Sequence, residues 1–195
     1  MQSQQRTLLV TEIALTAALS AVLGLFAVRL PINFAGGTIS LSMVPIFVLS
    51  LRRGVLPGVV AGMLFGCADL LIEPFFVAPI QVVLDYGVAF GVVGLAGLGC
   101  AAYQHALESS PGRAALVGVP FMVLGGLSRF AAAWLSGVVF FGQNAPAGQP
   151  VWLYSLAYNL SYVGPSLVIS IALALAVLPA LERAVPSGRF VQVAS

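Results

Sequence analysis

The chain has 195 residues, of which 60% are hydrophobic and 7% are charged, and its formal net charge is +2. A water-soluble domain carries about 25% charged residues, so this chain cannot cover a surface that faces water. The composition therefore predicts a polytopic membrane protein, with one integral-membrane domain over residues 1–195. The small net charge excludes a strongly basic nucleic-acid-binding surface.

Six apolar runs predict six transmembrane helices, which makes the fold class an all-α membrane protein. In chain order the runs cover residues 7–29, 39–52, 55–73, 79–103, 114–141 and 151–181. The connections between them are short and contain Gly, Pro and polar residues, as turns do. The first run carries Glu12 in its core, so we expect a retained helix rather than a cleaved signal peptide.

The arginines predict the orientation in the membrane. Arg52 and Arg53, in the segment "LSLRRG", separate the second and third runs. When the N-terminus is placed in the cytoplasm, six arginines lie on the cytoplasmic side: Arg6, Arg52, Arg53, Arg113, Arg183 and Arg189. Only Arg29 then lies outside, which agrees with the positive-inside rule. We therefore expect cytoplasmic N- and C-termini and a tight cytoplasmic turn at Arg52 and Arg53.

Four ionisable residues fall inside the predicted spans, where each is a functional candidate: Glu12, Asp69, Asp85 and Arg129. Asp85 is expected about 9 Å below the outer end of its helix, from a rise of about 1.5 Å per residue. Arg129 on the fifth helix either helps to bind a ligand or pairs with Asp85 as a structural bridge. Asp69 is expected to be structural, and Glu12 to face a partner or an arginine of the cytoplasmic turn.

Polar and aromatic side chains are expected at a depth similar to that of Asp85. They are Gln81, Trp134, Phe141, Tyr154, Tyr158 and Asn159. A carboxylate among aromatic faces suits a small, flat, cationic ligand. The glycine-containing loop "NFAGGTIS" is placed to close over such a site. The alternative for Trp134, Trp152 and Tyr154 is a place in the aromatic belt at the membrane interface.

Small residues recur at intervals of four on the first helix, at Ala14 and Ala18 and again at Ala17 and Ala21. Strips of this kind let helices approach closely in a bilayer. Packing inside the bundle and docking of a partner helix are both open interpretations. The two cysteines, Cys67 and Cys100, lie in apolar segments. We therefore expect them to be packing residues rather than part of a disulfide or a metal site.

Four segments carry a resemblance to a known family: "TEIALTAALS" (11–20), "VPIFVLSLRRG" (44–54), "QVVLDYGVAFGVVGLAGL" (81–98) and "YSLAYN" (154–159). In this order, and over about residues 8–181, the chain resembles the thiamine-specific substrate-binding subunit, or S-component, of energy-coupling factor (ECF) transporters. The resemblance implies a bundle that captures the vitamin from outside. It also implies two kinds of partner: a transmembrane coupling protein, docked through Ala14 and Ala18, and two ATPase subunits that supply the energy.

The resemblance also implies a set of ligand-binding residues. The family's pocket glutamate corresponds to Asp85, the tyrosine after it to Tyr86, and a tyrosine and an asparagine of the last helix to Tyr154 and Asn159. A pocket tyrosine is replaced by Phe75 and a pocket tryptophan by Phe141. The family's pocket histidine corresponds to Ala133, so neighbouring Trp134 is a candidate for the missing stacking. The resemblance also places a second pocket tryptophan of the family near Gly36 of this chain.

These departures leave a related ligand, such as a thiamine precursor or analogue, as an alternative to thiamine. An intramembrane enzyme and an assembly subunit are the alternatives from other classes. The only histidine, His105, falls in a predicted cytoplasmic loop, so a buried Ser–His pair is excluded. Asp69 and Asp85 lie near outer helix ends and outside any protease-like motif. We therefore expect a protein of a prokaryotic cell membrane that is not an enzyme and has no cofactor.

Overall fold

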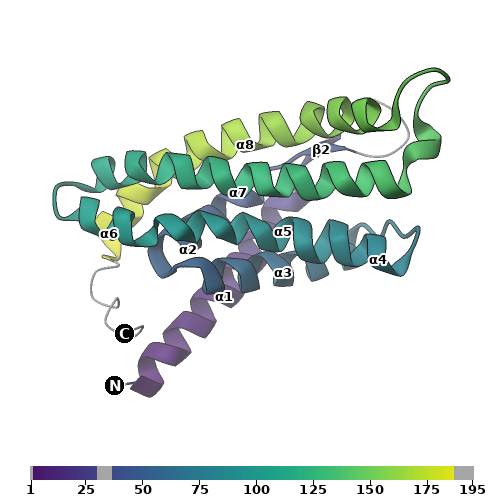
Figure 1. The fold of residues 1–195 in the computed structure, drawn as a ribbon. Helices are drawn as coiled ribbons and strands as arrows, with labels where there is room; N and C mark the ends of the chain where they lie inside the picture. The colour runs from purple at the N-terminus through teal and green to yellow at the C-terminus, as the bar shows by residue number, and fades with distance from the viewer. Residues whose placement is uncertain (1, 30–36, 187–195) are drawn as a thin grey trace.

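Helices make up nearly all of the part of the chain that the computed structural model describes, residues 2–29 and 37–186 (Figure 1). The first half contains α1 (Gln2–Leu25), β1 (Val28–Arg29), β2 (Thr38–Ile39), α2 (Met43–Arg53) and α3 (Val55–Ile72). Next comes one irregular helix made of α4 (Pro79–Val82), η1 (Val83–Val88), α5 (Ala89–Gly91), η2 (Val92–Gly99) and α6 (Cys100–Leu107). The chain continues with α7 (Pro111–Phe140), η3 (Gly142–Asn144) and α8 (Val151–Ala184). The predicted all-α class is confirmed.

Five of these helices are long and apolar enough to cross a bilayer, counted over the described residues. They are Gln4–Leu25, Val55–Ile72, Pro79–Leu107, Pro111–Phe140 and Val151–Ala184. The sixth, α2, has 11 residues and is about 16 Å long, whereas a span needs about 20 residues. All of its residues except Arg53 are buried, so its apolar run fills the protein core instead of facing lipid.

The first helix lies earlier in the chain than predicted. It was expected over residues 7–29, but α1 covers Gln2–Leu25, and the chain then enters the antiparallel pair of β1 and β2. In this pair Val28 lies opposite Ile39, and β-branched residues favour such an extended conformation. Apolar content alone does not distinguish the end of a helix from a short apolar strand, which explains the error.

Glycines bring α3 into backbone contact with the irregular helix. Gly58, Gly62 and Gly66 recur at intervals of four on α3 and are buried. A methyl group on Gly62 would overlap the carbonyl oxygen of Phe90, and one on Gly66 would overlap that of Tyr86. Intervals of four small residues permit this close approach. The contact fixes the segment that contains Asp85 and Tyr86 against α3.

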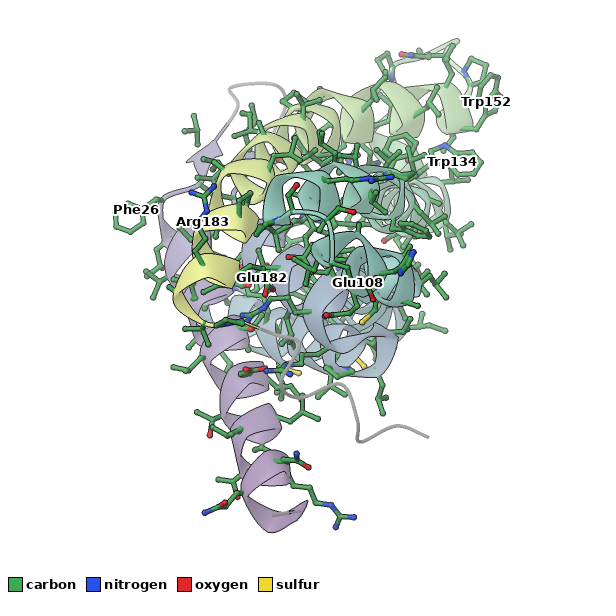
Figure 2. All side chains as sticks on the ribbon, turned by 90° about the vertical axis from the view of Figure 1, so that its left-hand side faces the viewer. Phe26, Glu108, Trp134, Trp152, Glu182 and Arg183 are labelled. Carbon is green, nitrogen blue, oxygen red and sulfur yellow. The ribbon has the colours of Figure 1, made fainter. Side chains whose placement is uncertain are left out.

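A buried ion pair joins α2 to the end of α8. Arg52 Nε lies 2.8 Å from Glu182 Oε1, and both side chains are less than one-tenth exposed. The Tyr103 hydroxyl donates to the same oxygen at 3.2 Å, and Arg52 Nη2 donates to the Val185 carbonyl at 2.5 Å. Figure 2 shows Glu182 turned toward the interior of this end of the bundle. Arg52 is therefore a packed residue of the core and not only a charge that sets topology.

Arg53 makes the second ion pair of the α2–α3 turn. Its Nε and Nη2 donate to the two carboxylate oxygens of Glu12 at 2.5 and 2.6 Å. One of the two predictions for Glu12, a contact with an arginine of the turn, is thus confirmed. The pair holds α1 against the α2–α3 turn. The assignment of this end to the cytoplasm stays a prediction.

Candidate ligand-binding site

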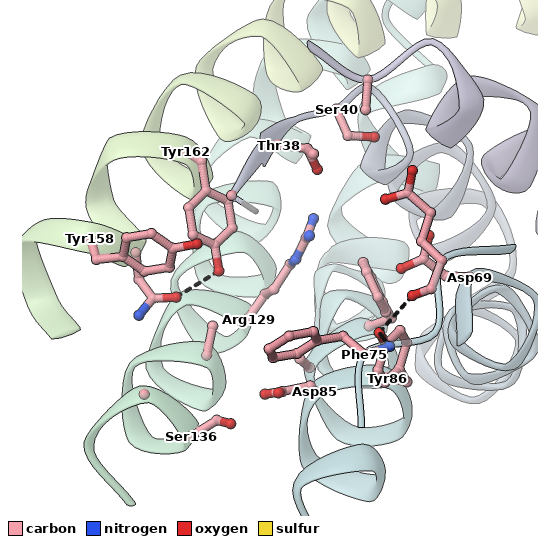
Figure 3. A pocket seen from close by; sticks show the side chains of 18 of the residues that line it. Thr38, Ser40, Asp69, Phe75, Asp85, Tyr86, Arg129, Ser136, Tyr158 and Tyr162 are labelled. Atoms are coloured by element: carbon pink, nitrogen blue, oxygen red, sulfur yellow. Dashed lines mark hydrogen bonds between the residues drawn. The ribbon is translucent and has the colours of Figure 1, made fainter. Parts of the chain in front are cut away.

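A cavity of about 570 Å³ lies beside β2 and the connection between α3 and α4. Figure 3 shows side chains that line it. The two ion pairs involve the α2–α3 turn and the C-terminal end of α8, at the other end of the bundle (Figure 1). The cavity wall includes residues of α3, the α3–α4 connection, the irregular helix, α7 and α8, and Gly37, Thr38 and Ser40 around β2 form part of it. Sites for small organic molecules have volumes of about 300–1,000 Å³. The cavity is therefore large enough for such a ligand.

Asp85 provides a carboxylate on the cavity wall. It lies in η1, a π-helical stretch of the irregular helix, and π-helical turns are frequent at functional sites. Gln81, one turn earlier, donates to Asp85 Oδ2 at 2.6 Å through Nε2. Ser136 of α7 points toward Asp85, and its hydroxyl is buried (Figure 3). A carboxylate and a buried hydroxyl thus converge on the same part of the cavity.

Tyr86 lines the cavity and also fixes the segment between α3 and α4. Its hydroxyl donates to the Glu73 carbonyl at 2.9 Å and accepts from the backbone N–H of Phe75 at 3.0 Å. These bonds hold Phe75 beside Phe141, whose ring centre lies 5.7 Å away at an angle of 28°. The two phenylalanines form a stacked aromatic pair on the wall.

Three tyrosines at intervals of four line the cavity from α8. The rings of Tyr154 and Tyr158 are stacked with centres 6.2 Å apart, and those of Tyr158 and Tyr162 meet edge to face at 5.5 Å. Asn159 lies on the same wall and accepts a hydrogen bond of 2.6 Å from the Tyr162 hydroxyl. Sequence reasoning missed Tyr162, although the four-residue interval from Tyr154 and Tyr158 would have indicated it.

Arg129 lies in the cavity wall with 9% of its surface exposed. Its guanidinium carbon is 4.4 Å from the centre of the Phe90 ring, a cation–π distance. Its Nη1 has no hydrogen-bond partner within residues 2–29 and 37–186. The same residues show no ion pair between Arg129 and Asp85, whose partner is Gln81, so the predicted structural bridge is not formed. Asp69, expected to be structural, lines the cavity as well.

Trp134 does not line the cavity, contrary to the prediction. Its indole N–H donates to the Trp152 carbonyl at 3.0 Å, and Figure 2 shows the two tryptophans together on the outer side of the bundle. The preceding residue, Ala133, faces the cavity instead. Neighbouring side chains on a helix point about 100° apart, so Trp134 cannot replace a residue at position 133. The position of both tryptophans favours the interfacial belt. Gly36, the expected place of a second family tryptophan, lies outside the described residues.

The alanines of α1 fall on two faces. Ala17 is buried and Ala21 packs against the core, whereas Ala14 and Ala18 are exposed. The two strips that the spacing identified therefore have different surroundings. Ala17 and Ala21 serve packing within the chain, and Ala14 and Ala18 leave a shallow surface open to another helix.

Comparison with known proteins gives consistent matches. The family described as "Thiamine transporter protein (Thia_YuaJ)" matches residues 10–185. The thiamine transporter ThiT of Bacillus subtilis is 39% identical over 170 residues, which cover 86% of this chain and 88% of the relative. ThiT of Lacticaseibacillus paracasei is 32% identical over 194 residues, covering 95% and 92%. A solved structure of ThiT from Listeria monocytogenes superposes with a TM-score of 0.76 at 25% identity, covering 93% of this chain and 96% of that one.

These matches cover nearly the whole chain, and the relatives are named as transporters. They confirm the predictions of a multi-pass cell-membrane protein and of a function that is not enzymatic. They also confirm the resemblance to thiamine-specific S-components. The chain therefore belongs to the thiamine transporter family.

Proposed function

We propose that this chain is the substrate-capture subunit of an ECF-type vitamin importer, and that it binds thiamine in the cavity around Asp85. In this proposal a transmembrane coupling protein and two ATPase subunits drive the release of the vitamin into the cell. The observation that carries the proposal is the chemistry of the cavity. A carboxylate held by Gln81 lies among aromatic rings from three parts of the chain.

The charges on the cavity wall favour a cation. Among the described residues, three carboxylates line it, those of Asp69, Glu73 and Asp85, against one guanidinium, that of Arg129. Thiamine carries a positive thiazolium ring and a flat aminopyrimidine ring. Aromatic faces stack on rings and attract cations, and a carboxylate compensates positive charge most strongly where water is excluded. Phe75, Phe141 and the tyrosines of α8 supply such faces.

The position of the cavity supports capture from outside. The C-terminal end of α8, which carries Arg183 and meets Arg52 through Glu182, lies at the other end of the bundle from β2 and α4, beside which the cavity lies (Figure 1). Since clusters of arginine favour the cytoplasmic side, the cavity end is expected to face the exterior.

A thiamine precursor or analogue is the second candidate, and Ala133 is the observation that favours it. A methyl group lines the cavity where the family's histidine is expected. The wall therefore lacks one ring and one hydrogen-bonding group, which leaves room for a different substituent. Competition between thiamine and its isolated aminopyrimidine moiety distinguishes the two ligands.

The direct test is the binding of thiamine to the purified chain in detergent. We expect saturable binding with one thiamine per chain, measured by isothermal titration calorimetry and checked by native mass spectrometry. Riboflavin, a flat vitamin without a fixed positive charge, is the matched control and should not bind. Absence of thiamine binding, or equal binding of both vitamins, would contradict the proposal.

The docking part of the proposal has its own test. Replacing Ala14 or Ala18 with Leu should leave thiamine affinity unchanged and abolish co-purification with the coupling protein, because a large side chain prevents close helix approach. Ala172, an exposed alanine of α8, provides the control: A172L should assemble normally. Normal assembly and uptake of A14L and A18L would exclude these alanines as the docking surface.

A further inference from the structure

The amide of Asn159 is held in one orientation by a chain of hydrogen bonds. Asn159 is 3% exposed, and its Nδ2 donates to the Ser155 carbonyl at 2.8 Å and to Ser155 Oγ at 3.2 Å. The Ser155 hydroxyl in turn donates to the Trp134 carbonyl at 2.8 Å. On the other side, Asn159 Oδ1 accepts from the Tyr162 hydroxyl at 2.6 Å.

The Ser155 end of this chain has a fixed direction. A backbone carbonyl only accepts, so the Ser155 hydroxyl must donate its hydrogen to Trp134 and can only accept from Asn159. The Ser155 carbonyl also needs a donor, which the amide nitrogen supplies. A flipped amide would place Oδ1 against two acceptors, and the Tyr162 hydroxyl would have to turn its hydrogen away in order to accept from the amide nitrogen. Leaving buried acceptors facing each other without a donor disfavours the flipped amide.

The orientation decides what Asn159 offers to a ligand. Both hydrogens of its amide nitrogen are donated to Ser155. Its Oδ1 has two lone pairs, and only one of them accepts the hydrogen bond from Tyr162. Asn159 is part of the cavity wall, so the free lone pair is an acceptor for whatever binds there. Tyr162 is itself held, because Gly37, the residue before β2, lies beside its ring and the ring packs on Tyr158.

We propose that Tyr162 is a positioning residue that keeps the Asn159 amide oxygen available to the ligand. The group that Asn159 recognises is then a hydrogen-bond donor, such as the amino group of an aminopyrimidine. This inference rests on the proposed function and names the ligand chemistry that the α8 wall selects. It assigns to Tyr162 a part in specificity through Asn159, without requiring that the phenol touch the ligand.

The test compares thiamine with oxythiamine, in which an oxo group replaces the amino group and an acceptor therefore replaces a donor. Two acceptors facing each other bind poorly, and sites that hydrogen-bond one group discriminate strongly against its opposite. We expect the wild-type chain to prefer thiamine over oxythiamine by about 100-fold or more. In Y162F the amide oxygen loses the hydroxyl that holds it in place, and the preference should fall by about 10-fold.

The measured quantity is the ratio of the two dissociation constants, obtained by titration calorimetry for the wild-type chain, Y162F and S155A. S155A removes the hydroxyl that fixes the nitrogen side and should lower the ratio in the same direction. S128A, which removes an exposed hydroxyl bound only to its own helix, is the control and should keep the wild-type ratio. An unchanged ratio in Y162F, or an equal loss of both ligands, overturns the inference. A wild-type chain that binds neither compound contradicts the proposed function instead.

Discussion

Replacement of Asp85 with Asn should weaken thiamine binding by about 100-fold, which corresponds to about 2.7 kcal/mol. Asp85 is the carboxylate that lies among the aromatic residues of the cavity, with one oxygen held by Gln81 at 2.6 Å. The variant keeps the size of the side chain and removes its charge, so a cationic ligand loses its counter-charge in a site of low dielectric constant. Truncating one partner of a buried charged contact costs about 2–5 kcal/mol. Titration calorimetry with purified protein measures the effect.

Two further variants separate charge from packing. D85E keeps the carboxylate and lengthens the side chain by one methylene group, so it should bind within about 10-fold of the wild type. E108Q removes an exposed carboxylate far from the cavity and should bind like the wild type. If D85N binds thiamine as tightly as the wild type, the charge of Asp85 contributes nothing to recognition. The cation would then have to be compensated elsewhere, for example by Asp69.

The helices could be predicted from the sequence because long apolar runs have few other stable arrangements in a bilayer. The same signal was ambiguous for residues 39–52, since a buried core helix is as apolar as one that faces lipid. Only the contacts of α2 on all sides show that it is internal. The glycine contacts between α3 and the irregular helix depend on which faces meet. From the sequence alone, the positions of Gly62 and Gly66 did not identify which helix packs against them.

The cavity was predictable where a charged or polar side chain has no place in lipid. Asp85, Arg129 and Asn159 stood out for that reason, and all three line one cavity. Aromatic residues gave a weaker signal, because lipid interfaces and binding sites both accept them. Trp134 and Ala133 are adjacent in the chain and face different surroundings, and helix rotation decides which of them lines the wall. Ser136 is small, and serine is common, so the place of its hydroxyl beside Asp85 was visible only in the structure.

Replacement of Arg52 with Met should destabilise the folded protein by about 3–5 kcal/mol, because it removes the guanidinium that pairs with the buried carboxylate of Glu182. The Glu182 side chain is 3% exposed, and the Tyr103 hydroxyl is too weak a partner to replace a guanidinium. The Val185 carbonyl loses its donor as well. We expect the midpoint of thermal unfolding in detergent to fall by about 10 °C, given about 2–4 °C per kcal/mol for a chain of this length.

The matched variants show whether the ion pair or the packing of the arginine is responsible. The double variant R52M/E182M removes both charges and should recover most of the lost stability, since buried ion pairs are often no better than apolar residues of similar volume. R53M breaks the pair with Glu12, whose side chain is 29% exposed, and should cost about 1 kcal/mol or less. If R52M and R53M shift the midpoint equally, burial of Glu182 is not the cause. Thiamine affinity should remain unchanged in the double variant, because the pair lies at the end of the bundle opposite the cavity.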